Sequence, residues 1–188
     1  MRFCLRSILL ALLTLAAVTC SIAGPDDWPR WRGPSSNGVS TLKNLPSSWS
    51  HDHNVAWKTA VPGRGHASPV VWGNRVFLTT DIEGDVLPGA APVKHKMEGQ
   101  PFRHPDSVGG THKHTLKVLC FDAGAGKQLW ERTAYEGPVF DDIHKFNTYA
   151  SPTPVTDGNY VYVYFESQGL YKYDFDGNLA AGVQYPRP

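Results

Sequence analysis

The fold class is decided by Cys120–Trp130, which reads Cys-Phe-Asp-Ala-Gly-Ala-Gly-Lys-Gln-Leu-Trp. Asp122 can accept hydrogen bonds from the backbone amides of the turn, and Gly124 and Gly126 can take the positive φ that a tight turn requires. The apolar residues that follow, ending at Trp130, resume a strand that needs a neighbour to cover it. This stretch predicts a β-hairpin that is closed by a large aromatic side chain.

The rest of the chain has the same character, because short runs of Val, Tyr, Phe and Leu alternate with Gly, Pro and Asp turns and show no helical period. Asp81–Thr115 is different: it holds five Gly and four Pro and no strand pattern, so it is expected to be a long insertion that is either disordered or a surface flap. The pattern predicts an all-β protein with strands at Val55–Val61, Ser68–Trp72, Arg75–Thr80, Leu116–Asp122, Lys127–Thr133, Ser151–Thr156, Tyr160–Phe165 and Gly169–Phe175.

Two parts of the chain repeat each other. Pro69–Leu78 aligns with Pro154–Val163 at a shift of 85 residues. Tyr160–Phe165 is apolar on both of its alternating faces, as a sheet covered by two neighbours requires. Four-stranded units in tandem predict blades of a β-propeller. The pattern stops where Ala180 stands in place of a tryptophan, so the expected fold is an incomplete β-propeller of about two four-stranded antiparallel blades.

These residues resemble the pyrroloquinoline-quinone-like (PQQ-like) repeat family of β-propellers, which includes quinoprotein dehydrogenases and a propeller lipoprotein of the outer-membrane protein assembly machinery. Its blade motif, Ala-x-Asp-x-x-Thr-Gly-Lys-x-x-Trp, is matched by Asp122, Gly126, Lys127 and Trp130. The resemblance implies that the tryptophan docks against the adjoining blade, and Trp57 takes the same role because its surroundings resemble those of Trp130. Family propellers close with about seven or eight blades, so the resemblance implies either a truncated product of a longer gene or several copies assembled into a ring.

The predicted organisation follows from these boundaries. Residues 1–23 have the arginines, the short apolar run and the small residues of a secretory signal peptide. An irregular segment spans 24–54, a first blade region spans 55–133 with the insertion 81–115, a second, incomplete blade spans 134–179, and a divergent tail spans 180–188. The chain is expected to be exported to the periplasm or beyond, without a membrane span after signal removal; lipidation at Cys20, with outer-membrane association, is the alternative.

Charge and cysteine content argue against a nucleic-acid-binding protein and against a protein stabilised by disulfides. Without residues 1–23 the chain carries 16 Lys and Arg against 17 Asp and Glu, so nothing favours nucleic acid as a partner. Cys120 then has no clear partner for a disulfide inside the chain. The expected partners are other envelope proteins or further propeller blades.

The candidate ligand-binding residues are polar side chains in loops near the two repeated inner strands: Arg64, His66, Asn147 and Gln168. Arg64, with a glycine on either side, can approach an anionic group closely. Asn147 and Gln168 supply neutral hydrogen bonds. The competing interpretation is that these residues only satisfy backbone groups at the rim of a blade.

No catalytic residue and no metal site are predicted. Two His-x-His pairs, at 51/53 and 112/114, have the spacing of a chelate on a strand, and His95 and His104 share the insertion, but no third ligand stands at a diagnostic spacing. No triad, nucleophile elbow or phosphate loop is present. The predicted function is therefore a non-catalytic binding or scaffolding module without cofactor. The alternatives are the first blades of a PQQ-dependent dehydrogenase that oxidises alcohols or sugars, and a non-functional remnant.

Overall fold

The computed structural model describes residues 23–184, so residues 1–22 of the predicted signal peptide, with Cys20, and the last four residues of the predicted tail lie outside the described part. The all-β prediction is confirmed. Two four-stranded antiparallel sheets dominate, each with its strands in chain order. The first sheet consists of β1 (Val70–Trp72), β2 (Arg75–Val86), β6 (His112–Asp122) and β7 (Gln128–Pro138), and the second of β9 (Val155–Thr156), β10 (Tyr160–Tyr164), β11 (Leu170–Asp174) and β12 (Leu179–Val183).

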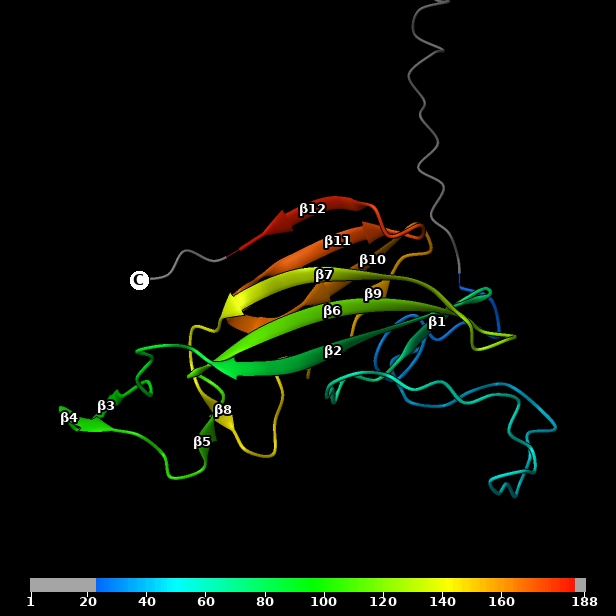
Figure 1. The fold of residues 1–188 in the computed structure, drawn as a ribbon. Coiled ribbons are helices and arrows are strands. Elements are labelled where there is room, and N and C mark those ends of the chain that lie inside the picture. The colour runs from blue at the N-terminus through cyan, green and yellow to red at the C-terminus, as the bar shows by residue number, and fades with distance from the viewer. Residues whose placement is uncertain (1–22, 185–188) are drawn as a thin grey trace, which may run out of the picture.

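Two small strand pairs lie apart from these sheets, at the lower left of Figure 1. One joins β3 (His95–Met97) to β4 (Gln100–Phe102), and the other joins β5 (Ser107–Val108) to β8 (Ile143–His144). A single turn of 3₁₀ helix, η1 (Glu166–Gln168), links β10 to β11. In the part of the chain that the structure describes, no helix is both long and apolar enough to cross a membrane.

The insertion prediction for 81–115 is wrong at both of its ends. Residues 81–86 continue β2 and residues 112–115 begin β6, and the two strands pair from Arg75↔Asp122 out to Val86↔His112 across one irregularity. Residues 81–86 and 112–115 are mostly polar, so they show no apolar alternation that would predict a strand. They pair through backbone hydrogen bonds, which require no apolar side chains. Between these ends the chain forms β3, β4 and β5, which also lack an apolar alternation.

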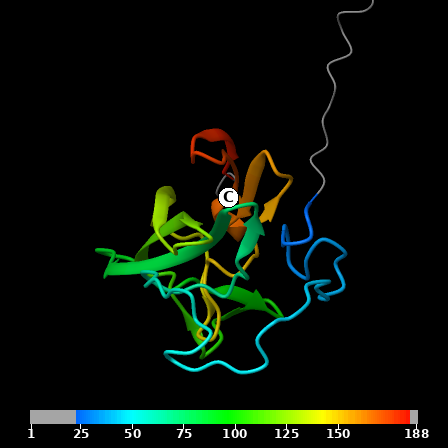
Figure 2. The same cartoon turned by 90° about the vertical axis from the view of Figure 1, so that its right-hand side faces the viewer.

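The core lies between the two sheets, which run side by side in Figures 1 and 2. Alternate residues of β6 enter it from the first sheet, and alternate residues of β10 and β11 enter it from the second. Tyr149 and Ala150, from the segment that connects the sheets, complete it. The fully or nearly buried core side chains include Val70, Phe77, Leu116, Val118, Cys120, Trp130, Val161, Val163, Phe165, Tyr171 and Tyr173.

The second sheet leaves its other face open. Tyr160, Tyr162 and Tyr164 alternate with the buried residues of β10, as the sequence predicts, and Tyr164 is 43% exposed. Their cross-strand partners include Leu170, which is 44% exposed, and Lys172, whose Nζ lies 3.6 Å from the centre of the Tyr160 ring. This outer face is therefore aromatic and uncovered.

Two strand predictions near the ends of the pattern are wrong. The tail 180–188, expected to be divergent with no strand in its Gly182–Pro188 part, begins inside β12, which pairs with β11 from Leu170↔Val183 to Tyr173↔Leu179. Val55–Val61, expected to be a strand, has no ladder partner in the described residues, although its composition is typical of one. A segment forms a strand where a neighbouring strand offers its backbone for pairing. Composition alone therefore gave the wrong prediction for both segments.

The only cysteine of residues 23–184 is a free thiol in the core. Cys120 has no exposed surface, and burial raises its pKa to about 11, although the nearby Arg75 guanidinium acts in the opposite direction. We expect the native protein to resist a thiol reagent at pH 8, because only roughly one thiol in a thousand would then be ionised. Reaction with a chromogenic disulfide in native buffer and in denaturant checks this: rapid modification of the native protein would contradict it.

Candidate functional site

Trp130 joins the two sheets through the turn between β11 and β12. Its Nε1–H donates to the carbonyl oxygen of Phe175 at 2.8 Å. Its ring covers Gly177 so closely that a Cβ there would lie 2.8 Å from Trp130 Cδ2. Two residues further along β7, Arg132 Nε donates to the carbonyl oxygen of Gly177 at 2.7 Å. A side chain of the first sheet thus clamps the turn of the second.

Trp57 makes the same contacts with the turn between β6 and β7. Its Nε1–H donates to the carbonyl oxygen of Ala123 at 2.8 Å, and a Cβ on Gly126 would lie 2.4 Å from Trp57 Cδ2. Thr59, again two residues further along, donates to the carbonyl oxygen of Gly126 at 2.5 Å. We call the two sets of contacts the tryptophan–glycine locks: Trp57 with Gly126, and Trp130 with Gly177.

The remaining motif residues shape the turn itself. Asp122 Oδ1 accepts from the amide of Ala125 at 2.7 Å, and Gly126 has a φ of 67°. Gly124, expected to take a positive φ as well, does not do so. The side chain of Lys127 is exposed, and its carbonyl oxygen accepts from the amide of Asp122 at 2.9 Å.

Arg64 and His66 line an open hollow of about 460 Å³ between the segment 61–69 and β2. The backbone of Arg64 pairs with that of Asp81, with both N–H to O distances at 2.8 Å. The amides of His66 and Ala67 both donate to the carbonyl oxygen of Ala150, at 3.2 Å each. The sequence Ala-Ser-Pro occurs at residues 67–69 and again at 150–152, and these hydrogen bonds bring the two copies together.

The glycines beside Arg64 serve the backbone rather than a ligand. A Cβ at Gly63 would lie 2.3 Å from the carbonyl oxygen of Asp81, and one at Gly65 would lie 2.7 Å from that of Thr79. Only glycine lets this segment lie so close against β2. Contact with β2 therefore explains why glycines stand on both sides of Arg64. Their predicted role, to bring Arg64 close to an anion, is not needed to account for them.

Gly63→Ala tests this close approach. We expect it to lower the free energy of unfolding by about 1–3 kcal/mol more than Gly89→Ala, because the added methyl group overlaps β2. Gly89 is the matched control: its φ of 74° is close to the 76° of Gly63, but a Cβ there meets nothing within 4 Å. Urea unfolding of the two variants measures the difference, and equal losses would show that the contact with β2 is unimportant.

The side chains at the hollow offer several polar groups to a ligand. Arg64 lies 3.9 Å from Glu83, and both side chains are substantially exposed, so its charge is only partly offset. Thr79 Oγ1 is buried beside the hollow and has no hydrogen-bond partner in the described residues. Arg64 and His66 offer donors to an anionic or strongly polar ligand, and no carboxylate is among the described residues that line this hollow.

Asn147 and Gln168 do not line this hollow. Asn147 Oδ1 accepts a hydrogen bond from Ser151 Oγ, which fixes the turn before β9. Gln168 is 3% exposed in η1, and its carbonyl oxygen accepts from the hydroxyl of Tyr171 at 2.9 Å. The four candidate ligand residues are thus divided between three places.

A buried pair of side chains involves Asp81, the residue whose backbone pairs with that of Arg64. His114 and Asp81 are each only 1% exposed in their side chains, and His114 Nδ1 lies 2.7 Å from Asp81 Oδ1. His114 Nε2 donates to the carbonyl oxygen of Gly109 at 3.1 Å, and the ring stands edge-on to Tyr149 at 4.6 Å. Burial lowers the pKa of His114, but the hydrogen bond and the charge of Asp81 with the Gly109 carbonyl outweigh it, so the pKa is raised above its ordinary 6.5.

The histidines of the two His-x-His pairs make separate contacts. His114 is committed to Asp81, while His112 Nδ1 lies 3.3 Å from Thr111 Oγ1. On the other pair, His51 contacts the neighbouring carboxylate of Asp52 on the surface. The structure instead brings His104 of the insertion close to Asp106 and to His144, a grouping that sequence spacing does not reveal.

No protein-family model matches the chain, and no curated protein matches it.

Proposed function

We propose that this chain is a non-catalytic binding or scaffolding module of the cell envelope, built from PQQ-like repeat blades in a propeller arrangement. The observation that carries the proposal is the recurrence of the tryptophan–glycine lock. Both locks use an indole N–H on the carbonyl that follows an aspartate, a glycine of positive φ under the ring, and a donor two residues after the tryptophan. Tandem blades stack in this repeating way.

The module has two places where further units add. The segment that carries Trp57 makes the lock contacts of an outer strand but has no ladder of its own in the described residues. At the other end, the outer face of the second sheet exposes Val155, Tyr164 and Leu170. Apolar sheet faces of this kind favour a protein partner, and a further blade has the matching shape.

A charged substitution on the outer face tests the scaffolding role. The wild-type chain is expected to self-associate or to bind a hydrophobic fluorescent dye, and Leu170→Glu is expected to reduce either signal several-fold. Val86→Glu, on an exposed residue of β2 outside this face, is the matched control and leaves the signal unchanged. A monomeric wild-type chain that binds no dye and melts sharply would contradict the proposal.

The same protein tests the absence of catalysis. After addition of PQQ and calcium, the proposal expects no bound chromophore and no reduction of an artificial dye with alcohols or sugars. Retained chromophore with substrate-dependent dye reduction would support the dehydrogenase alternative and overturn the proposal.

A further inference from the structure

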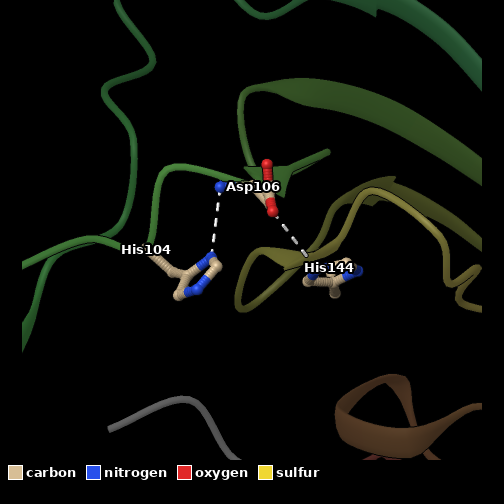
Figure 3. A group of neighbouring side chains, drawn as sticks. All are labelled: His104, Asp106 and His144. Carbon is tan, nitrogen blue, oxygen red and sulfur yellow. Dashed lines mark hydrogen bonds and ion pairs between the residues drawn. The ribbon is translucent and has the colours of Figure 1, made fainter.

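A cluster of three side chains forms where the insertion meets the segment after β7. The short pairing of β5 with β8 places Ser107 opposite His144, and Asp106 immediately precedes β5. His104 lies just before them in the chain, and its ring centre is 5.9 Å from that of His144. Figure 3 shows the two imidazoles on either side of the Asp106 carboxylate.

The spacing of the three side chains suits a single small cation. One ligand atom each of His104, Asp106 and His144 can be chosen so that all three lie within 4.8 Å of one another. Around a tetrahedral zinc ion, with bonds of about 2.0–2.2 Å, ligand atoms stand about 3.3–3.5 Å apart. The side chains of His144 and Asp106 are 46% and 36% exposed, so small rotations can close the remaining distance.

Local hydrogen bonds already orient the cluster. The amide of Asp106 donates to His104 Nδ1 at 3.1 Å, and the amide of Phe146 donates to His144 Nδ1 at 3.3 Å. His144 Nε2 lies 3.5 Å from Asp106 Oδ2. Lys145 Nζ lies 2.9 Å from the other oxygen of Asp106, so a metal ion and this ammonium compete for one carboxylate.

We propose that His104, Asp106 and His144 bind a divalent transition-metal ion of the zinc type, with water in the remaining position. Two imidazole nitrogens and one carboxylate oxygen form a donor set that favours zinc or copper over calcium and magnesium. The bound ion adds a further tie between the insertion and the segment after β7, which are already joined by the two-residue pairing of β5 with β8 and by the contacts of Asp142 with Arg103 and with the amide of Gly110. The site is independent of the proposed scaffolding face on the second sheet.

Calorimetric titration of the full chain with zinc tests the site. The double variant His104→Ala/His144→Ala is expected to bind zinc more than about tenfold more weakly than the wild type. The matched control, His51→Ala/His53→Ala, removes two exposed histidines elsewhere and leaves the affinity unchanged. Circular dichroism confirms that both variants are folded. Equal affinity of wild type and the first variant, or equally strong binding of magnesium by the wild type, would overturn the proposal.

Lys145→Gln provides a test in the opposite direction. Removal of the competing ammonium is expected to strengthen zinc binding several-fold, whereas a purely structural role for the cluster predicts no gain. Hydrogen exchange supplies a readout besides affinity: zinc is expected to slow exchange of the amides at 107–108 and 143–144 in the wild type and not in the double variant. Unchanged exchange in the wild type at saturating zinc would contradict the proposed tie.

Discussion

Asp81→Ala is expected to lower the free energy of unfolding by about 3–5 kcal/mol, because it leaves His114 buried without its counter-charge. The Gly109 carbonyl can only accept, so His114 Nε2 carries a proton, and an ionised Asp81 requires a second proton on Nδ1. With His114 protonated and Asp81 ionised, the pair is an imidazolium and a carboxylate inside the protein. Asp85→Ala, on an exposed residue of the same strand, is the control and changes stability by no more than about 0.5 kcal/mol.

The same pair gives stability a defined pH dependence. The pKa of His114 is raised in the folded state above the ordinary 6.5, so its contribution is fully present below pH 6.5 and is lost as the pH rises through the folded pKa. We expect the wild type to lose stability between neutral and alkaline pH, and Asp81→Ala to lose less over that range. Urea unfolding from pH 6 to pH 9 measures this, and a flat wild-type profile would refute the ionised pair.

Trp130→Ala is expected to cost about 3–5 kcal/mol, the loss typical of a large aromatic side chain removed from a core. Trp130 is only 8% exposed, contacts the rings of Phe77 and Tyr173, and donates to the second sheet. Its loss opens a cavity between the sheets and leaves the Phe175 carbonyl with one donor fewer. Thermal and urea unfolding measure the effect.

Trp31→Ala is the control for this variant, since Trp31 is 62% exposed and its removal leaves stability within about 0.5 kcal/mol of wild type. Trp130→Phe separates packing from the hydrogen bond, because it keeps most of the ring area and loses the indole N–H. Similar small losses in all three variants would show that the lock between the sheets contributes little.

Local features of the fold could be predicted from the sequence. The hairpin at Cys120–Trp130 and the alternation in Tyr160–Tyr164 depend on turn chemistry and on a period of two, both visible in a few residues. The sequence did not predict β12, because Leu179–Val183 consists largely of small residues and is exposed at every position, so it shows no apolar alternation. It owes its form to β11, and pairing with a neighbour leaves no apolar pattern to detect.

The candidate sites were less predictable because they depend on contacts between distant parts of the chain. Arg64 and His66 were predicted as ligand residues from their place before a repeated strand, and both line the hollow. The close approach of Gly63 to Asp81 and the pairing that brings Asp106 to His144 join residues far apart in sequence. Such contacts leave no signal in the local sequence. Only the long-range pairing of β5 with β8 brings His144 close to His104 and Asp106.

The tryptophan–glycine locks also limit how the sequence can change over evolutionary time. Each lock requires a glycine under the ring and a tryptophan whose N–H donates to a backbone carbonyl. The residue that supplies this carbonyl can be of any type, because every residue has one. Outside the locks and the buried Asp81–His114 pair, many inward-facing residues of the two sheets only have to stay apolar. Two units joined in this way can therefore differ at most of their side chains, whereas a Cβ at either glycine would overlap the indole that covers it.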